Sequence, residues 1–222
     1  MAEDLVSSRR KVGILGHIGS TSDLEFYLSS NSEGVQLSLI SGLARHNKLT
    51  LNLAKQFFEV PRSKVKIRTL ENLKNICDID LSKNNQILNC LIAKSLQDAD
   101  PLVNVYGLIA LSDLVEQEYS TSGGCIQFAD FVKVVCDLVD NASDYRVREA
   151  GVATLGVFGL TGEYSGLDTV ISHAANDKPK VRRRAVLALA TYTGSNVEKA
   201  LIMAAQDKDW QTRQAAEDLL KD

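Results

Sequence analysis

Three histidines are the residues of this chain best suited to metal binding or proton transfer. An iron site built on His-Glu pairs needs a glutamate directly after each of several histidines. Here the residues that follow His17, His46 and His173 are Ile18, Asn47 and Ala174. The histidines also occupy unrelated places in the repeat pattern described below, so their rings are not expected to converge on one ion. The sequence therefore predicts no metal site.

Two further motifs fail to predict catalysis. The run Gly13-Ile-Leu-Gly16-His-Ile-Gly19 contains three glycines, but no strand precedes it and its spacing is not that of a dinucleotide-binding loop. We interpret Gly16 and Gly19 as the end of a helix. A Gly-x-Ser-x-Gly nucleophile motif is absent from the sequence. We therefore predict no catalytic residue and no cofactor, while one enzymatic alternative is considered below.

The four cysteines do not form a redox or zinc motif, because no two are spaced as Cys-x-x-Cys. Cys90 and Cys136 fall in predicted helices, where we expect thiols that act as small apolar core residues. The chain has no apolar signal segment at its start and no apolar run near the ~20 residues that span a bilayer. We expect a protein without membrane insertion, in the cytoplasm or an equivalent reducing compartment.

The elements that would position any site follow from a repeat. Leucines recur at intervals of 28 to 44 residues, each at the end of a similar phrase of small and apolar residues: Leu15, Leu43, Leu73, Leu111, Leu155, Leu189 and Leu220. The clearest phrase runs from Val181 to Leu189, with apolar residues at offsets 0, 4, 7 and 8 from the valine. These offsets form one face of an α-helix. Inner or capping helices are predicted over 3–16, 34–47, 65–77, 102–117, 145–159, 180–192 and 210–221.

A shorter amphipathic stretch precedes each phrase from the second onward and predicts an outer helix, over 22–29, 49–59, 84–96, 125–140, 165–176 and 196–206. Pro61, Pro101 and Pro179 all lie shortly before a phrase, where a helix start tolerates the missing N–H. Asp100, Asp144 and Asp177 stand where N-caps are needed. The sequence predicts an all-α, right-handed α-α superhelix of about six helix pairs, forming one domain over residues 1–222.

The phrase Asp-x-x-Val-Arg-x-x-Ala-x-x-Ala-Leu resembles the HEAT repeat, and specifically its short variety from phycobilisome bilin lyases. Residues 144–155 and 177–189 match it well, and residues 209–220 fairly. The resemblance implies that Arg148, Arg182 and Arg213 pair with loop aspartates between repeats. Gln36, Lys66 and Asn104 replace this arginine in copies two to four, so the pairing is expected to be broken there.

The resemblance specifies the fold better than the function. Binding to nucleic acid is not favoured, because the net charge is −3 and the only tryptophan is Trp210 in the last copy. A phycobilisome-type bilin lyase subunit or a bilin-handling chaperone is the alternative that the resemblance implies. Tyr106 with Asp113 is the nearest approach to a bilin site, and it lacks the expected aromatic surroundings.

The function we predict is a non-catalytic scaffold or adaptor that binds a protein or peptide on its concave inner-helix surface. Offsets 2, 6 and 10 of each inner helix point away from the core, and in copies four to six they form an apolar stripe. Arginines beside the stripe are expected to orient an acidic partner. The predicted partner-binding residues are Val105, Ile109, Ala153, Val157, Leu187, Arg183 and Arg184.

Two surface features leave alternatives open. Residues Glu116 to Gly124 are expected to form a long loop, either functional or a tolerated insertion, and a second loop is expected near 77–84. Basic residues recur near the ends of the inner helices, either as a binding surface or as a solvated face. The N-terminal members of this basic set are Arg9, Arg10, Arg45, Lys48, Lys64, Lys66 and Arg68.

Overall fold

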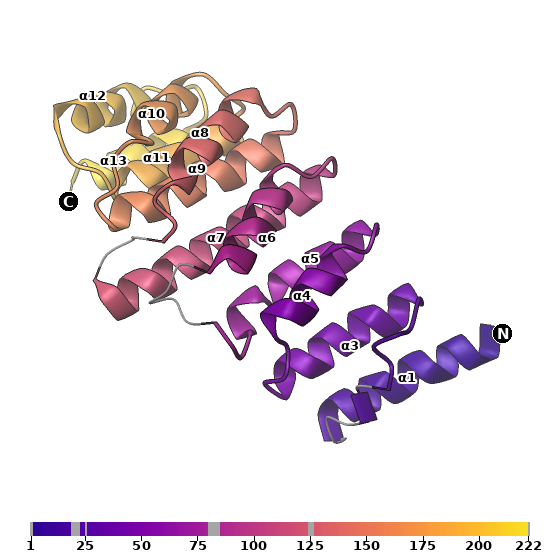
Figure 1. Cartoon of the computed structure of the whole chain (residues 1–222). Coiled ribbons are helices and arrows are strands. Elements are labelled where there is room, and N and C mark those ends of the chain that lie inside the picture. Colours follow the sequence, from indigo (N-terminus) through magenta and orange to yellow (C-terminus); the bar gives the residue numbers. More distant parts are fainter. Residues whose placement is uncertain (1, 19–22, 25, 80–84, 124–126, 222) are drawn as a thin grey trace. The chain divides into compact units, whose positions relative to one another are not determined.

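The computed structural model describes residues 2–18, 23–24, 26–79, 85–123 and 127–221, and these fall into two compact units, residues 1–95 and 96–222. The described residues contain twelve α-helices and no strand (Figure 1). The all-α repeat fold predicted from the sequence is therefore confirmed. Its right-handed sense and its description as one domain stay predictions.

Unit 1 contains the helices of the first repeats. They are α1 (Ala2–Ile18), α3 (Glu33–Arg45), α4 (Leu51–Phe58), α5 (Ser63–Glu71) and α6 (Gln86–Leu96), with a short 3-10 turn at Leu73–Asn75. Within this unit α3 packs against both α1 and α5, and α4 packs against α5. The expected outer helix at 22–29 and the expected loop at 77–84 lie partly outside the described residues.

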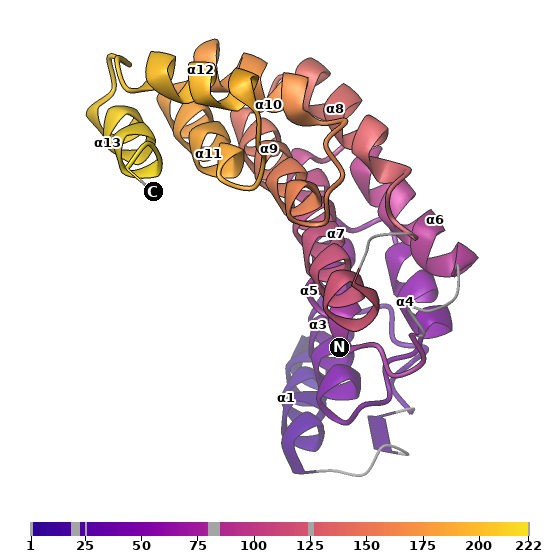
Figure 2. The same cartoon turned by 90° about the vertical axis from the view of Figure 1, so that its left-hand side faces the viewer.

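Unit 2 consists of two rows of helices. The inner row contains α7 (Pro101–Ser122), α9 (Tyr145–Leu160), α11 (Pro179–Leu189) and α13 (Trp210–Leu219), each packed on the next. The outer row contains α8 (Phe131–Asn141), α10 (Leu167–Ala175) and α12 (Ser195–Ala204), each packed on the inner helix that follows it. Figure 2 shows α9, α11 and α13 along the inside of the curve that these helices follow, with α8, α10 and α12 outside.

The predicted repeat frame matches the observed core. Every residue at offset 0 from the second copy onward is buried: Val35, Val65, Val103, Val147, Val181 and Thr212. Five of the seven marker leucines are also buried, with at most 1% of their surface exposed, namely Leu43, Leu73, Leu111, Leu155 and Leu189. Each inner helix therefore buries one stripe of residues against its neighbours, as the 3.6-residue period requires.

The first and last marker leucines depart from this pattern. Leu15 is only half-buried, and Leu220 is 41% exposed and lies at the C-cap of α13. Both belong to terminal helices, each of which packs on a single neighbour in the inner row. The prediction that all seven leucines form the core is wrong for these two, because among the described helices only one inner-row neighbour packs against each of them.

Small residues allow the inner helices to approach closely. A Cβ atom on Gly156 of α9 would lie 2.9 Å from the Cβ and 3.2 Å from the backbone Cα of Ala188 on α11. The backbone of α11 cannot move away without disturbing its own packing, so only glycine fits at this crossing. The buried Tyr192 hydroxyl crosses the same boundary and donates a hydrogen bond to the Leu155 carbonyl oxygen at 2.5 Å.

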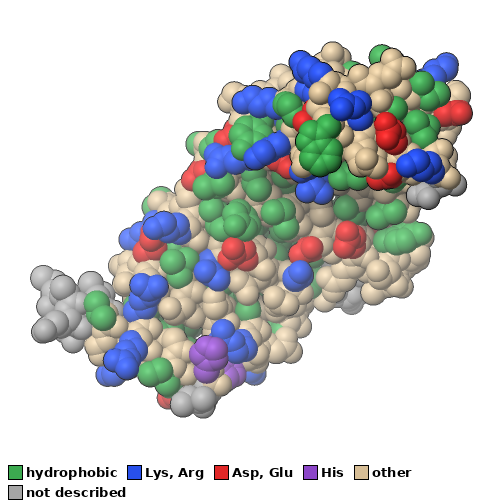
Figure 3. Space-filling view, turned by 180° about the vertical axis from the view of Figure 1, so that it is seen from behind, with side chains coloured by type: hydrophobic (Ala, Val, Ile, Leu, Met, Phe, Trp, Pro, Cys, Tyr) green, Lys and Arg blue, Asp and Glu red, His purple; other side chains and the backbone are tan. Residues whose placement is uncertain are grey.

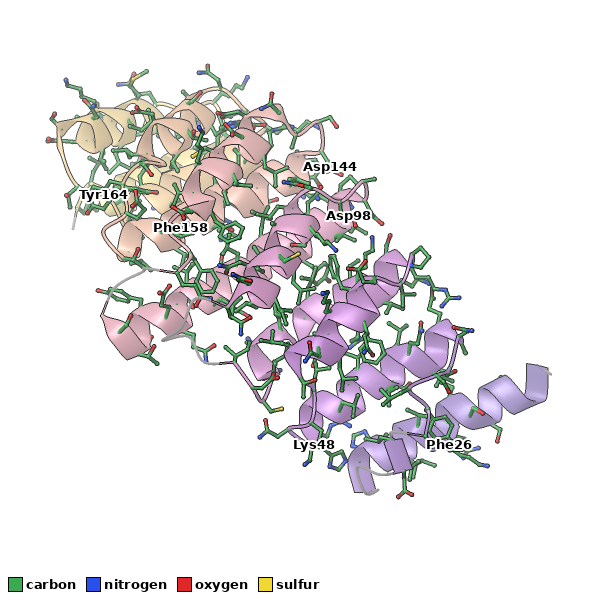
Figure 4. The ribbon with its side chains drawn as sticks, viewed as in Figure 1. Phe26, Lys48, Asp98, Asp144, Phe158 and Tyr164 are labelled. Atoms are coloured by element: carbon green, nitrogen blue, oxygen red, sulfur yellow. The ribbon has the colours of Figure 1, made fainter. Side chains whose placement is uncertain are left out.

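The aspartates that were predicted to be N-caps occupy that position, with one exception. Asp100 and Asp144 are the N-caps of α7 and α9, and their carboxylates accept from the amides of Leu102 and Arg146, both at 2.9 Å. Pro101 and Pro179 are the first residues of their helices, as expected. The N-cap of α11 is Lys178 and not Asp177, whose carboxylate is used for the ion pair described below. Figure 4 shows Asp98 and Asp144 at the same end of the helices of unit 2.

Two helices extend further along the chain than the sequence predicts. Helix α7 extends through Ser122, so residues 116–122 form its last two turns and not a long loop. It ends at Gly123, which has a left-handed φ of 73° and donates its N–H to the Tyr119 carbonyl at 2.8 Å. Similarly, α1 continues to Ile18, so Gly16 is an interior residue that packs on Gly42 of α3. Gly19 and Gly124 lie outside the described residues.

We predict that truncating a buried marker leucine will weaken the fold, whereas truncating Leu220 will not. Leu155→Ala and Leu189→Ala should each lower the free energy of unfolding by about 2–5 kcal/mol, because each leaves a cavity in a fully buried position. Leu220→Ala should change it by less than about 0.5 kcal/mol. Urea melts followed by circular dichroism would measure all three; equal losses for the three variants would mean that the repeat frame is misassigned.

Candidate protein-interaction surface

A ladder of arginine–aspartate pairs holds successive repeats of unit 2 in register. Arg148 of α9 donates two hydrogen bonds to Asp177, from Nε at 2.7 Å and from Nη2 at 2.8 Å. Arg182 of α11 forms the same pair with Asp207, at 2.7 and 2.6 Å. Both arginines also donate Nη1 to loop carbonyls, those of Ala142 and Asp177 respectively. Such bidentate pairs fix orientation as well as charge.

Asp177 is the most strongly held carboxylate of this ladder. Its side chain is 4% exposed, and it also accepts from the Lys178 amide at 2.6 Å and hydrogen-bonds with His173 Nδ1 at 2.8 Å. Burial by itself raises the pKa of Asp177, but the hydrogen bonds from Arg148, Lys178 and His173 outweigh it and lower the pKa to about 2. His173 Nε2 also contacts the Asp140 carboxylate of α8 at 3.1 Å.

The ladder is confirmed for two of the three arginines that the resemblance named. Arg213 donates instead to the backbone carbonyls of Asp207 and Lys208, at 2.7 and 3.1 Å, with no carboxylate partner among the described residues. Different bonds hold the earlier copies. Gln36 accepts from Arg62 at 3.1 Å, and Asn104 donates to the Asp98 carbonyl at 3.0 Å, so this amide keeps a backbone contact of the kind made by the arginines.

The predicted apolar residues lie on the three inner helices α7, α9 and α11, which pack side by side. Ile109 and Leu187 are 48% and 44% exposed, while Val105, Ala153 and Val157 are half-buried. We call these five residues the inner-helix stripe. Ile109, Ala153 and Leu187 share offset 6 in consecutive repeats and so form a row across the helices, flanked by Val105 and Val157. Figure 3 shows hydrophobic side chains gathered on this face, with acidic side chains beside them.

Charged residues surround the inner-helix stripe unevenly. Glu149 and Arg183 share offset 2 with Val105, and Asp113 shares offset 10 with Val157. Arg183 is half-buried and donates Nη1 to Gln211 Oε1 of α13 at 2.6 Å. Arg184 is exposed but stands one residue further around α11. Of the two arginines, Arg183 therefore shares the exposed face of the stripe.

The remaining expectations concern metal ions, thiols and membranes. Among the described residues, no group of three or more His, Cys, Asp or Glu side chains is placed to hold a metal ion. Cys77 and Cys90 are exposed, so the expectation of core thiols is wrong for them, whereas burial raises the pKa of the half-buried Cys136. Cys125 lies outside the described residues. No helix in the described part of the chain has the length and apolar content to cross a membrane.

Sequence reasoning missed two features of the structure. The outer helix α12 exposes Ile202 by 49% and Met203 by 69%, although outer helices were expected to cover the core. In unit 1, arginines from three separate helices line one hollow, which a single-helix pattern does not reveal. Both features depend on which helices are neighbours, so no local spacing signal could have located them.

These features define a helical-repeat protein of the solenoid class. A family model described as HEAT repeats matches residues 125–221, which include the complete arginine–aspartate ladder. The family resemblance is thus found for the C-terminal repeats. No curated protein matches the chain, and no finding separates the phycobilisome-lyase variety from other HEAT repeats.

Solved structures of similar fold cover most of the chain. The YibA protein of Escherichia coli matches with a TM-score of 0.61 and 16% identity, over 96% of this chain and 72% of that protein. A designed armadillo repeat protein matches with 0.56 and 15%, over 91% and 99%. An engineered protein matches with 0.56 and 16%, over 90% and 96%. At these identities the likeness concerns the fold alone.

We predict that Asp177→Asn will destabilise the protein in a pH-dependent way. The pKa of about 2 in the folded chain lies below the ordinary value of 3.8, so the stabilisation is fully present above pH 4 and is lost as the pH falls towards 2. At pH 7 the variant should lose about 2–4 kcal/mol, because Arg148 is left without its partner. Urea melts between pH 7 and pH 2.5 should show the difference from the parent protein shrinking.

The matched control is Asp137→Asn, which removes an exposed carboxylate on α8. Its unfolding free energy should stay within about 0.5 kcal/mol of the parent at both ends of the range. A difference between the parent and Asp177→Asn that is constant from pH 7 to pH 2.5 would contradict the assigned role of Asp177.

Proposed function

We propose that this protein is a non-catalytic scaffold or adaptor that binds a protein or peptide segment on the inner-helix stripe of unit 2. The observation that carries the proposal is the row of apolar side chains at offset 6, from Ile109 through Ala153 to Leu187. A helix face on the surface of a soluble protein is usually polar. An apolar row that continues across three repeats therefore supports an interaction surface.

The surroundings of the stripe support a particular kind of ligand. The half-buried Val105 and Val157 widen the row, so an extended or helical segment with apolar side chains would cover it. Arg183 at one edge offers N–H groups to a carboxylate of the partner, while Glu149 and Asp113 repel a second acidic group there. We therefore infer a mainly apolar partner segment with a single acidic residue, placed beside α11. Because Arg184 stands one residue further around α11, it would contact such a partner only outside the row of apolar side chains at offset 6.

The fold is consistent with this role without specifying it. Helical repeats bury each unit on its neighbours and leave an extended surface, which is why such folds commonly mediate protein interactions. The bilin-handling alternative has no observation in its favour. Tyr106 and Asp113 lie on α7 about two turns apart, both half-buried, and no described hollow includes either of them.

We predict that placing a charge in the stripe will abolish partner capture without unfolding the protein. Ile109→Glu and Val157→Glu should each remove the captured protein from a pull-down, because the new carboxylate would have to be desolvated in the interface. Affinity capture from the native lysate, followed by mass spectrometry, would identify the partner with the parent protein. Thermal melts should show that both variants remain helical.

A control with the same chemistry is available on another face. Ile202 on the outer helix α12 is 49% exposed, closely matching Ile109 at 48%. Ile202→Glu should leave capture unchanged. If Ile202→Glu abolishes capture and Ile109→Glu does not, the interface lies on the outer row and the proposal fails.

A further inference from the structure

A hollow with a basic wall lies on unit 1, whereas the inner-helix stripe belongs to unit 2. Its basic part has a volume of about 240 Å³ and is lined by Arg9 and His17 of α1, Ser38, Ser41 and Arg45 of α3, and Arg68 of α5. An adjoining, more apolar part of about 470 Å³ shares Arg9, Gly13, His17 and Ser38 and adds Val6, Arg10 and Ile14. We call the two parts together the N-terminal hollow.

The three arginines are held in place by the helices around them. The aliphatic stem of Arg9 lies against the start of α3, so that a Cβ on Gly34 would be 2.9 Å from Arg9 Cδ. Arg45 donates Nη1 to the Gly16 carbonyl of α1 at 2.5 Å. Arg68 Nε lies 3.3 Å from the Glu71 carboxylate one turn further along α5. Three guanidinium groups from three helices therefore meet around one hollow.

The charge of this site is largely uncompensated. No aspartate or glutamate is among the described residues that line the hollow, and Glu71, which pairs with Arg68, lies outside its lining. The first 95 residues carry 13 Lys and Arg against 9 Asp and Glu, a net charge of +4. Residues 96–222 carry 12 against 19, a net charge of −7. The unit that contains the hollow thus has a net positive charge because it has fewer acidic residues, while Lys and Arg are divided almost equally between the two units.

These features match a phosphate monoester better than a carboxylate. A phosphorylated side chain brings a charge near −2 and three acceptor oxygens, whereas a carboxylate brings one charge and binds a single guanidinium well. The apolar part of the hollow, with the exposed Val6 and Ile14, offers room for a neighbouring apolar side chain. A phosphorylated peptide supplies both groups in one short segment.

The other phosphate-bearing macromolecules fit the hollow less well. Single-stranded nucleic acid is bound by aromatic side chains that stack on bases, and no Phe, Tyr or Trp lines the described hollow. Membrane binding by charge needs a broad basic surface. Here Glu33 of α3 pairs with Lys64 of α5, and Glu71 pairs with Arg68 one turn away on α5, so acidic groups interrupt the basic surface. The hollow also differs from a phosphate loop, because Gly13 is inside a helix and the charge comes from arginine side chains.

We propose that the N-terminal hollow binds a phosphoserine or phosphothreonine of a peptide, with Arg9, Arg45 and Arg68 on the phosphate and Val6 and Ile14 on a neighbouring apolar side chain. This site is independent of the inner-helix stripe, since the two share no residue and belong to different units.

The test uses the full chain and two degenerate peptide libraries, one with phosphoserine fixed at its centre and one with serine. The parent protein should retain the phosphoserine library at least about tenfold better. Arg9→Gln and Arg68→Gln should each remove most of this preference. Lys11→Gln is the matched control, because it removes the same charge from an exposed position of α1 outside the hollow and should have no effect.

A second variant tests the hollow without changing its charge. Nothing lies within 4 Å of a Cβ placed on Gly13, so Gly13→Leu should fold, raise the helix propensity of α1 and fill the hollow. Its phosphoserine preference should be lost while its thermal melt is unchanged or raised. Equal retention of both libraries by the parent protein, or full binding by Gly13→Leu, would overturn the proposal.

Two competitors separate the remaining sources of phosphate. Single-stranded RNA and vesicles containing a phosphoinositide should displace the phosphoserine library poorly. If either binds the parent protein more tightly than the library and loses binding in Arg9→Gln, the site belongs to that ligand and the phosphopeptide proposal is wrong.

A peptide library with glutamate at its centre should be retained no better than the serine library. If it is retained as well as the phosphoserine library, a carboxylate is enough for binding and the phosphopeptide proposal is wrong.

Discussion

The close contact between successive inner helices is the constraint on which the rest of unit 2 depends. Gly156 on α9 meets Ala188 on α11 with no room for an added methyl group, and Thr154 lies buried against α7, where it donates to the Leu108 carbonyl at 3.2 Å. When the residues at offsets 0, 4, 7 and 8 of an inner helix are buried in the core, the residues at offsets 2 and 6 must face solvent. The inner-helix stripe is therefore a geometric consequence of the packing that stabilises the fold.

The packing of small residues determines the distance between two neighbouring helices, but it only weakly restrains how far one helix can slide along the axis of the other. The arginine–aspartate ladder supplies that second restraint, because a bidentate pair has a definite direction. Arg148 and Arg182 each connect their own helix start to the loop before a later helix. The Arg148–Asp177 pair joins α9 to the loop before α11, so it restrains Ala153 relative to Leu187. Helix α7, which contains Ile109, packs directly on α9.

The two units differ in how they are stabilised and in what their surfaces offer. Unit 2 contains the regular ladder and an excess of acidic residues, and its exposed apolar row suits a segment with apolar side chains. In unit 1 Gln36 and Lys66 stand in place of the ladder arginines, and the arginines Arg9, Arg45 and Arg68 line the N-terminal hollow. The two proposed ligands differ accordingly, an apolar segment for the inner-helix stripe and an anionic one for the N-terminal hollow.

The sequence by itself determined the class of fold, the helix frame and most of the buried residues, because a 3.6-residue period directly reports which face of each helix is apolar. It correctly assigned Val35 through Thr212 to the core and located the starts of α7 and α9 from Asp100, Asp144 and the prolines. It misplaced features that depend on neighbours. Leu220 is exposed at the C-cap of α13, which packs on a single described inner helix, and residues 116–122 are helical although their composition resembles a loop.

Tertiary structure alone decided which side chains from different helices meet. The stripe could be anticipated from the sequence because its members repeat one offset in consecutive copies, so the repeat itself carries the information. The N-terminal hollow could not, since Arg9, Arg45 and Arg68 occupy different places in their helices and converge only through the way α1, α3 and α5 pack. A repeat pattern specifies the spacing within each helix, whereas the contacts between irregular positions follow from the distance and angle at which neighbouring helices pack.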